Sequence, residues 1–274
     1  MTDSPRFAFG RNWESFSHVI SEDRIIASMD GLRRLLRCED LAGKSFLDIG
    51  CGSGLSSLAA LRLGANIRAF DYDQDSVETA QRLLDNAAPT GIAYTVEQGS
   101  ALDEAFMSNL GSFDVVYSWG VLHHTGGMWQ GIDLAAKRVA PGGRLALALY
   151  NDQGGASRRW LAIKQLYVKG PSPARWALVA AVGAWFESRA AFIRLARGQN
   201  PLPLADWRKR RQDRGMSVWH DLIDWVGGLP FEVAKPEAVF NFLRERGFLL
   251  DGLSTCASGH GCNEYLFVRN PTHE

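Results

Sequence analysis

Residues 45–54 read Ser-Phe-Leu-Asp-Ile-Gly-Cys-Gly-Ser-Gly, and this stretch decides the fold. Its apolar run indicates a buried strand, and glycines at alternate positions indicate a tight turn before a helix over 55–63. Gly64 follows that helix, as is typical of helix C-termini. The glycines let a ligand approach the backbone, and we expect some of them to take a positive φ. The stretch therefore predicts a ligand-binding turn.

Glycine spacing separates two classes of cofactor that use such a turn. The dinucleotide fingerprint G-x-G-x-x-G would place its third glycine at position 55, which is Leu55. The spacing therefore disfavours an NAD-dependent oxidoreductase. A turn that holds no ligand stays open as an alternative.

A second short strand is expected over 65–71, and it ends in Asp71. Asp71 follows Gly50 by 21 residues, the interval at which a carboxylate reaches a nucleoside ribose in doubly wound folds. A cis-diol presents two hydroxyl donors, and an ionised carboxylate accepts both of them. Asp71 is therefore predicted to bind a ribose, although it could merely end the strand.

Strands and helices continue to alternate along the chain. Further strands are expected over 92–96, 113–118, 144–150, 248–255 and 263–269. Helical spacing is found over 14–37, 128–139 and 236–246. This alternation predicts an α/β fold with a doubly wound, mostly parallel sheet.

Five motifs together resemble the class I S-adenosylmethionine (SAM)-dependent methyltransferases, in particular those similar to quinone-biosynthesis (ubiquinone-type) methyltransferases. They lie within 105 residues, at 46–54, Asp71, 99–103, 113–125 and 141–150. The resemblance implies a seven-stranded Rossmann-like sheet with an antiparallel C-terminal strand pair, and SAM as the cofactor. It is nearly silent on the substrate.

The resemblance assigns most cofactor contacts to the ends of the parallel strands. Ser100 stands where relatives usually carry an acid that bonds the adenine amino group, and Tyr72 is expected to stack on the adenine edge. An N-terminal helix would bring Arg11 to the SAM carboxylate, although Arg11 could equally be a surface residue. The predicted cofactor contacts are Asp48, Gly50, Cys51, Gly52, Gly54, Asp71, Tyr72, Ser100, Ala101, Leu102, Trp119, Arg11 and Trp13.

A histidine pair follows the fourth parallel strand, at the sheet edge where ligands bind. His124 matches the position of a histidine in relatives, and His123 is its neighbour. A neutral imidazole suits removal of an acceptor proton at neutral pH, so we prefer O-methylation of a small molecule. Either histidine could instead pack or cap a turn. N- or C-methylation, another reaction of SAM, and a non-catalytic SAM-binding sensor or partner subunit remain alternatives, and no metal site is predicted.

We expect four segments: an N-terminal helical cap (1–42), the SAM-binding core (43–150), a helical lid insertion (151–235) and a C-terminal helix and strands (236–274). Residues 151–215 hold thirteen Lys or Arg and four Asp or Glu, a formal charge of +9 in a neutral chain. Such a lid would attract an anionic or amphipathic acceptor. A solvated basic face on an ordinary helical subdomain is the alternative. The predicted substrate contacts are Tyr150, Asn151, Arg158, Arg159, Trp160 and Lys164.

Composition bounds the remaining possibilities. The 30 basic and 30 acidic residues balance, so the chain as a whole offers no electrostatic case for nucleic acid. Four cysteines without C-x-x-C spacing and an N-terminus without an apolar signal predict a reduced, cytoplasmic protein. The apolar run 176–186 favours a buried or interfacial helix over a membrane span. Peripheral contact with an anionic membrane and the oligomeric state stay open.

Overall fold

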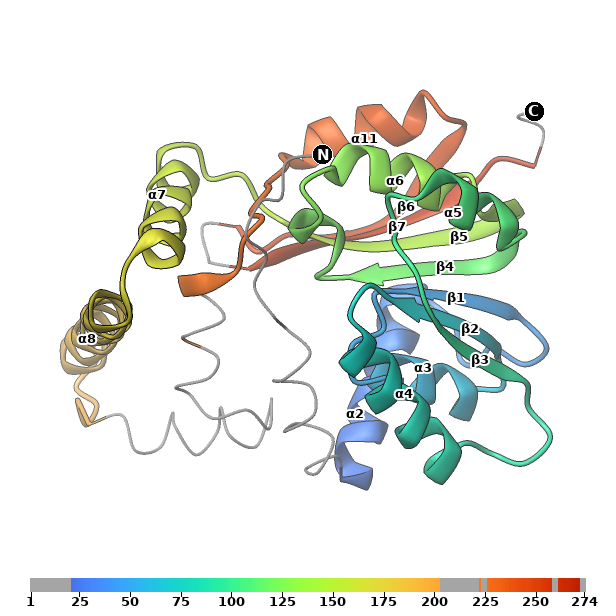
Figure 1. Cartoon of the computed structure of the whole chain (residues 1–274), viewed down its shortest axis with the longest axis horizontal. Coiled ribbons are helices and arrows are strands. Elements are labelled where there is room, and N and C mark those ends of the chain that lie inside the picture. Colours follow the sequence, from blue (N-terminus) through green and yellow to red (C-terminus); the bar gives the residue numbers. More distant parts are fainter. Residues whose placement is uncertain (1–20, 203–221, 223–225, 258–260, 272–274) are drawn as a thin grey trace. The chain divides into compact units, whose positions relative to one another are not determined.

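The computed structural model describes residues 21–202, 222, 226–257 and 261–271 (Figure 1). Two compact units divide the described chain: one holds the described residues within 154–230, and the other holds those on either side. Arg11 and Trp13 lie outside the described residues.

The larger unit is built on a seven-stranded sheet in the order β3-β2-β1-β4-β5-β7-β6. The strands are β1 (Ser45–Ile49), β2 (Asn66–Asp71), β3 (Tyr94–Gln98), β4 (Phe113–Trp119), β5 (Val139–Tyr150), β6 (Phe248–Ser254) and β7 (Cys262–Arg269). The first five strands pair in parallel, and β7 runs antiparallel to both of its neighbours, β5 and β6. The mostly parallel seven-stranded sheet with an antiparallel C-terminal strand pair, β6 and β7, is as predicted.

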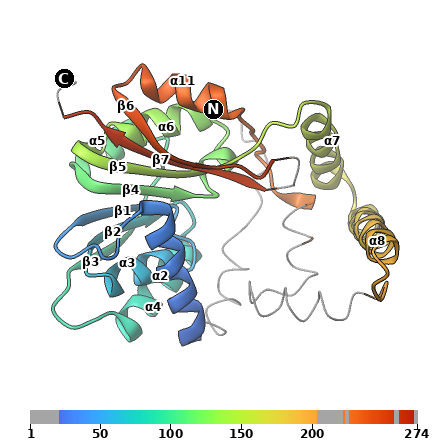
Figure 2. The ribbon, with the colours of Figure 1, turned by 180° about the vertical axis from the view of Figure 1, so that it is seen from behind.

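Helices cover both faces of this sheet (Figures 1 and 2). One face carries α2 (Glu22–Leu36), α3 (Leu55–Arg62) and α4 (Gln74–Ala87), and the other carries α5 (Glu104–Asn109), α6 (Met128–Ala136) and α11 (Pro236–Arg244). The pleat of β5 divides its side chains between two cores: Leu145 and Leu147 join the α5–α6–α11 core, and Ala146 joins the other. Two separate apolar layers therefore hold the sheet.

Some helix and strand boundaries differ from those predicted, because strand pairing over a long sequence distance extends β5. The helix expected over 128–139 ends at Ala136, because Val139 pairs with Phe113 and begins β5 five residues before the expected start. The pairing shifts register between Phe113 and Val115, which lets the Pro141 turn lie within the strand. The short helix α5 has no counterpart among the predictions.

The smaller unit contains α7 (Gly155–Lys169) and α8 (Ser172–Ala196). Trp160 of α7 stacks on Phe186 of α8, with ring centroids 5.8 Å apart and ring planes 11° apart. By length and composition α8 could cross a membrane: it has 25 residues, and its most apolar stretch has a mean hydropathy of 1.2. The sequence favoured a buried or interfacial helix over a membrane span because the apolar run 176–186 ends before Glu187. The helix continues beyond Glu187, where further apolar residues follow.

Candidate functional site

The glycine turn after β1 has the predicted left-handed backbone. Gly50, Gly52 and Gly54 have φ values of 76°, 53° and 79°. A Cβ at Gly50 would overlap the side chain of Val121, and one at Gly54 would lie 2.9 Å from the Cα of Ala80. The turn is therefore closely packed against the chain that follows β4 and against α4.

Asp71 at the end of β2 is bonded directly to this turn. Its Oδ2 accepts a hydrogen bond from the Gly52 backbone N–H (2.9 Å), and its Oδ1 accepts one from the Asp73 N–H (2.9 Å). Burial raises the pKa of the Asp71 carboxyl, while the two backbone hydrogen bonds oppose that rise. A fixed carboxylate therefore lies beside the glycine turn. The sequence spacing predicted that Asp71 lies near the glycine turn, but it did not predict the hydrogen bond from Gly52.

Asp48 supports the turn from inside the protein. It is 2% exposed, and its Oδ2 accepts a hydrogen bond from Ser57 Oγ (2.6 Å) at the start of α3. Burial raises the pKa of Asp48 to about 7; the Ser57 hydrogen bond lowers it, and the charge of Asp71 raises it further. Burial also raises the pKa of the Cys51 thiol, which makes that group a poor nucleophile. Neither side chain is presented to solvent, so any contact of Cys51 with a ligand would use its backbone.

The turn after β3 lies next to Asp71. The Gly99 N–H donates to the Asp71 carbonyl (2.9 Å), and Ser100 Oγ accepts a hydrogen bond from the Leu102 N–H (3.2 Å). Ala101 is buried and the ring of Tyr72 is 61% exposed. These residues form a second edge of the predicted cofactor site.

The two histidines after β4 differ in environment. They lie on a 3-10 turn, η1 (Leu122–His124). His123 is fully buried, and its Nδ1 accepts a hydrogen bond from the Tyr150 N–H (3.3 Å). His124 is partly exposed, and its ring meets the Tyr150 ring edge-on with centroids 5.3 Å apart. Only His124 therefore has a ring that a substrate could reach from solvent.

The end of β5 is tied to the neighbouring hairpin. Asn263 Nδ2 donates to Asn151 Oδ1 (3.1 Å), and Asn151 Nδ2 donates to the Ala257 carbonyl (3.3 Å). Tyr150 also packs against Phe231, with ring centroids 5.5 Å apart. The Asn151 side chain thus holds β5 to β7.

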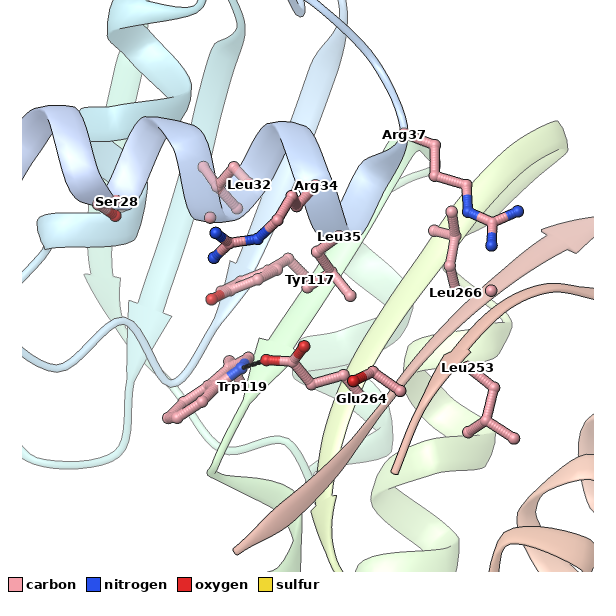
Figure 3. A pocket seen from close by; sticks show the side chains of 13 residues that line it. Ser28, Leu32, Arg34, Leu35, Arg37, Tyr117, Trp119, Leu253, Glu264 and Leu266 are labelled. Atoms are coloured by element: carbon pink, nitrogen blue, oxygen red, sulfur yellow. Dashed lines mark hydrogen bonds between the residues drawn. The ribbon is translucent and has the colours of Figure 1, made fainter. Parts of the chain in front are cut away.

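A cavity of about 450 Å³ lies between α2 and strands β4, β6 and β7, and the sequence did not indicate it (Figure 3). Trp119, 47% exposed at the end of β4, lines it and donates from Nε1 to Glu264 Oε1 (2.9 Å). Arg34 points into it from α2 and has no hydrogen bond or ion pair in the described part of the chain, whereas Arg37 pairs with Asp251 at 3.7 Å. The lining residues are Ser28, Gly31, Leu32, Arg34, Leu35, Arg37, Tyr117, Trp119, Gly252, Leu253, Ser254, Glu264 and Leu266.

The predicted substrate contacts in the smaller unit separate into surface and interior residues. Arg158 and Arg159 are exposed on α7. Trp160 is 8% exposed and stacks on Phe186, and Lys164 is 1% exposed. Trp160 therefore packs α7 against α8. Among the described residues, no group of three or more His, Cys, Asp or Glu side chains could hold a metal ion.

Comparison with known proteins identifies the core. Residues 47–145 match a family model described as a methyltransferase domain. This segment is a class I SAM-dependent methyltransferase domain. The domain is 35% identical over 112 residues to a ubiquinone biosynthesis O-methyltransferase from Xanthomonas oryzae pv. oryzae (strain PXO99A), covering 41% of this chain and 45% of that protein. A protein of the same name from Caulobacter sp. (strain K31) is 33% identical over 109 residues, covering 40% of this chain and 42% of the other. The match thus spans less than half of these relatives.

Solved structures agree with the methyltransferase fold. An O-methyltransferase family protein from Burkholderia thailandensis superimposes with a TM-score of 0.57 at 13% identity, over 96% of this chain and 60% of that one. Magnesium protoporphyrin IX methyltransferase from Synechocystis PCC 6803, solved with bound SAH, gives a TM-score of 0.52 at 15% identity, over 97% and 90%. At these identities the likeness concerns the fold.

Proposed function

We propose that the chain transfers a methyl group from SAM to a hydroxyl group of a small-molecule acceptor, with His124 as the general base. One observation carries this proposal: Val121 packs against Gly50, which brings the turn that bears His124 alongside the glycine turn of the methyltransferase domain. The O-methyltransferases among the relatives support oxygen as the acceptor atom.

The residues present fit SAM. The ionised Asp71 carboxylate would accept both hydroxyls of the ribose, and the segment 100–102 would border the adenine. Gly52, with a φ of 53°, has no side chain to keep a ligand away from its backbone. When bound, SAM supplies an electrophilic methyl group on a sulfonium, and the protein supplies position and proton transfer.

His124 would accept the proton that the acceptor hydroxyl loses as its oxygen is methylated. An imidazole with an ordinary pKa of about 6.5 is largely neutral, and so able to take a proton, at neutral pH. His123 is unsuited to this role because its Nδ1 already accepts the Tyr150 N–H and its ring is buried. Its role is to hold the end of β5.

We place the body of the acceptor in the cavity beside Trp119. That cavity shares Trp119 with the predicted site, and six of its thirteen lining residues are leucine, tyrosine or tryptophan. Glu264 accepts a hydrogen bond from Trp119 and Arg37 pairs with Asp251, so among the described residues Arg34 is the charged side chain of this cavity that makes no hydrogen bond or ion pair. An apolar or aromatic acceptor with an acidic substituent fits this arrangement. Arg34→Met should raise KM for such an acceptor several-fold and leave SAM affinity unchanged.

The test is methyl transfer from methyl-labelled SAM by the full chain to matched phenols, catechols and anilines, with and without a carboxylate. We expect label on oxygen, and we expect His124→Ala to lower kcat by about 10²–10⁴-fold while SAM affinity stays constant. The loss should shrink at high pH, where the acceptor ionises without help. Label on nitrogen alone, or an unchanged kcat and pH profile in His124→Ala, would overturn the proposal.

A further inference from the structure

Helix α8 of the smaller unit is apolar on a side that solvent reaches. Only four of its 25 residues are charged: Arg175, Glu187, Arg189 and Arg194. In its most apolar stretch only 11% of the residues are buried. A surface helix normally turns polar residues toward water, so an apolar exposed side indicates a contact surface.

One side of α8 is occupied by protein. Val179 and Val182 are buried, and Phe186 follows at helical spacing and stacks on Trp160 of α7. Among the described residues, α7 packs against this side and Leu222 lies next to Gly183, whereas the opposite side is exposed.

The opposite side forms a continuous uncharged strip. Trp185, Phe192 and Leu195 are 51%, 72% and 64% exposed. Ala181, Ala184 and Ser188 are exposed on the same side of the helix, at helical spacing from these three residues. Because their side chains are small, the three large side chains protrude beyond them. We call these six residues the outer strip: Ala181, Ala184, Trp185, Ser188, Phe192 and Leu195.

Positive charge lies beside the outer strip and near the ends of its helix. Residues 155–202 contain eight Lys or Arg and one acid, Glu187. The guanidinium of Arg189 lies 6.0 Å from the centre of the Trp185 ring, at the border of the strip. Arg175 and Arg197 are exposed near the two ends of α8. An apolar strip with a basic border is typical of helices that lie in the interface of anionic membranes.

We infer that the outer strip docks on the surface of an anionic lipid bilayer, with α8 lying in the membrane plane. A second copy of the chain is a poorer occupant, because two such basic units would repel each other. Crossing the bilayer is disfavoured because Glu187 and Arg189 would enter its apolar core and α7 packs along one side of the helix. The inference does not depend on the proposed methyl transfer.

The test is sedimentation of the full chain with vesicles of phosphatidylcholine alone or mixed with phosphatidylglycerol. The double variant Trp185→Glu with Phe192→Glu removes the apolar anchors. A matched control, Ile26→Glu with Leu249→Glu, adds the same charge at side chains of the larger unit that are 48% and 60% exposed. Circular dichroism should be unchanged in both variants.

We expect the parent and the control to sediment with the anionic vesicles, less so at high salt, and weakly with phosphatidylcholine alone. The outer-strip variant should lose at least about tenfold in bound-to-free ratio. Failure of the parent to bind anionic vesicles, or equal losses in both variants, would overturn the inference. So would a parent that self-associates through the strip without binding lipid.

Discussion

Replacing Asp48 with Asn tests the structural account of the glycine turn through its pH dependence. Asp48 is 2% exposed, and its pKa rises from an ordinary 3.8 to about 7 in the folded chain. Between about pH 4 and pH 7 the Asp48 carboxyl is ionised in the unfolded chain but still protonated in the folded chain. Raising the pH in this range therefore stabilises the unfolded state, and the free energy of unfolding falls until about pH 7. At about 1.4 kcal/mol per pKa unit, three units give a loss of at most about 4 kcal/mol.

Urea unfolding of the parent and Asp48→Asn, without SAM, measures this loss. The difference in free energy of unfolding, parent minus variant, should fall between about pH 4 and pH 7 and then level off. Subtracting the variant removes the contributions of the other titrating groups, and Asp30→Asn, at an exposed acid of α2, is the control. A difference that is constant from pH 4 to pH 8 would refute the burial of an acid with a raised pKa at this position.

Three further predictions concern the cofactor turn and the smaller unit. Gly52→Val places a β-branched residue at a φ of 53°, so calorimetric SAM affinity should drop at least about tenfold with the core still folded; unchanged affinity would contradict this. Trp160→Ala removes the stack on Phe186 at a cost of about 3–5 kcal/mol, and limited proteolysis should then cleave 154–202 faster than in the parent. Replacing Arg158 and Arg159 with Glu should raise KM for an anionic acceptor strongly at low salt and less at high salt. If the KM of this variant equals that of the parent at every ionic strength, the two arginines do not attract the acceptor.

The core could be predicted from sequence because its signals are local. The apolar run, the alternate glycines and the acid at the end of the next strand each lie within a few residues, and the register of β1 on β2 brings the turn and Asp71 together. Boundaries were harder to predict, because Val139 joins β5 through a long-range pair with Phe113 that no local pattern reveals.

The site was less predictable for geometric reasons. His123 and His124 are adjacent in sequence, yet the 3-10 turn buries one ring and leaves the other partly exposed. Trp160 was expected to line a pocket, whereas its ring packs between helices, a contact that depends on Phe186, 26 residues away. The cavity at Arg34 joins α2 to three strands, so it requires the assembled sheet.

The most direct test of the central claim, a SAM site built on the glycine turn and Asp71, is calorimetric titration of SAM into the parent, Asp71→Ala and Asp75→Ala. Asp75 is exposed on α4, so its loss removes the same charge nearby without touching the turn. A charged hydrogen bond contributes about 1.5–3 kcal/mol, so Asp71→Ala should bind SAM roughly tenfold to a hundredfold more weakly, while Asp75→Ala matches the parent. A parent that does not bind SAM, or an Asp71→Ala variant that binds as tightly as the parent, would contradict the claim.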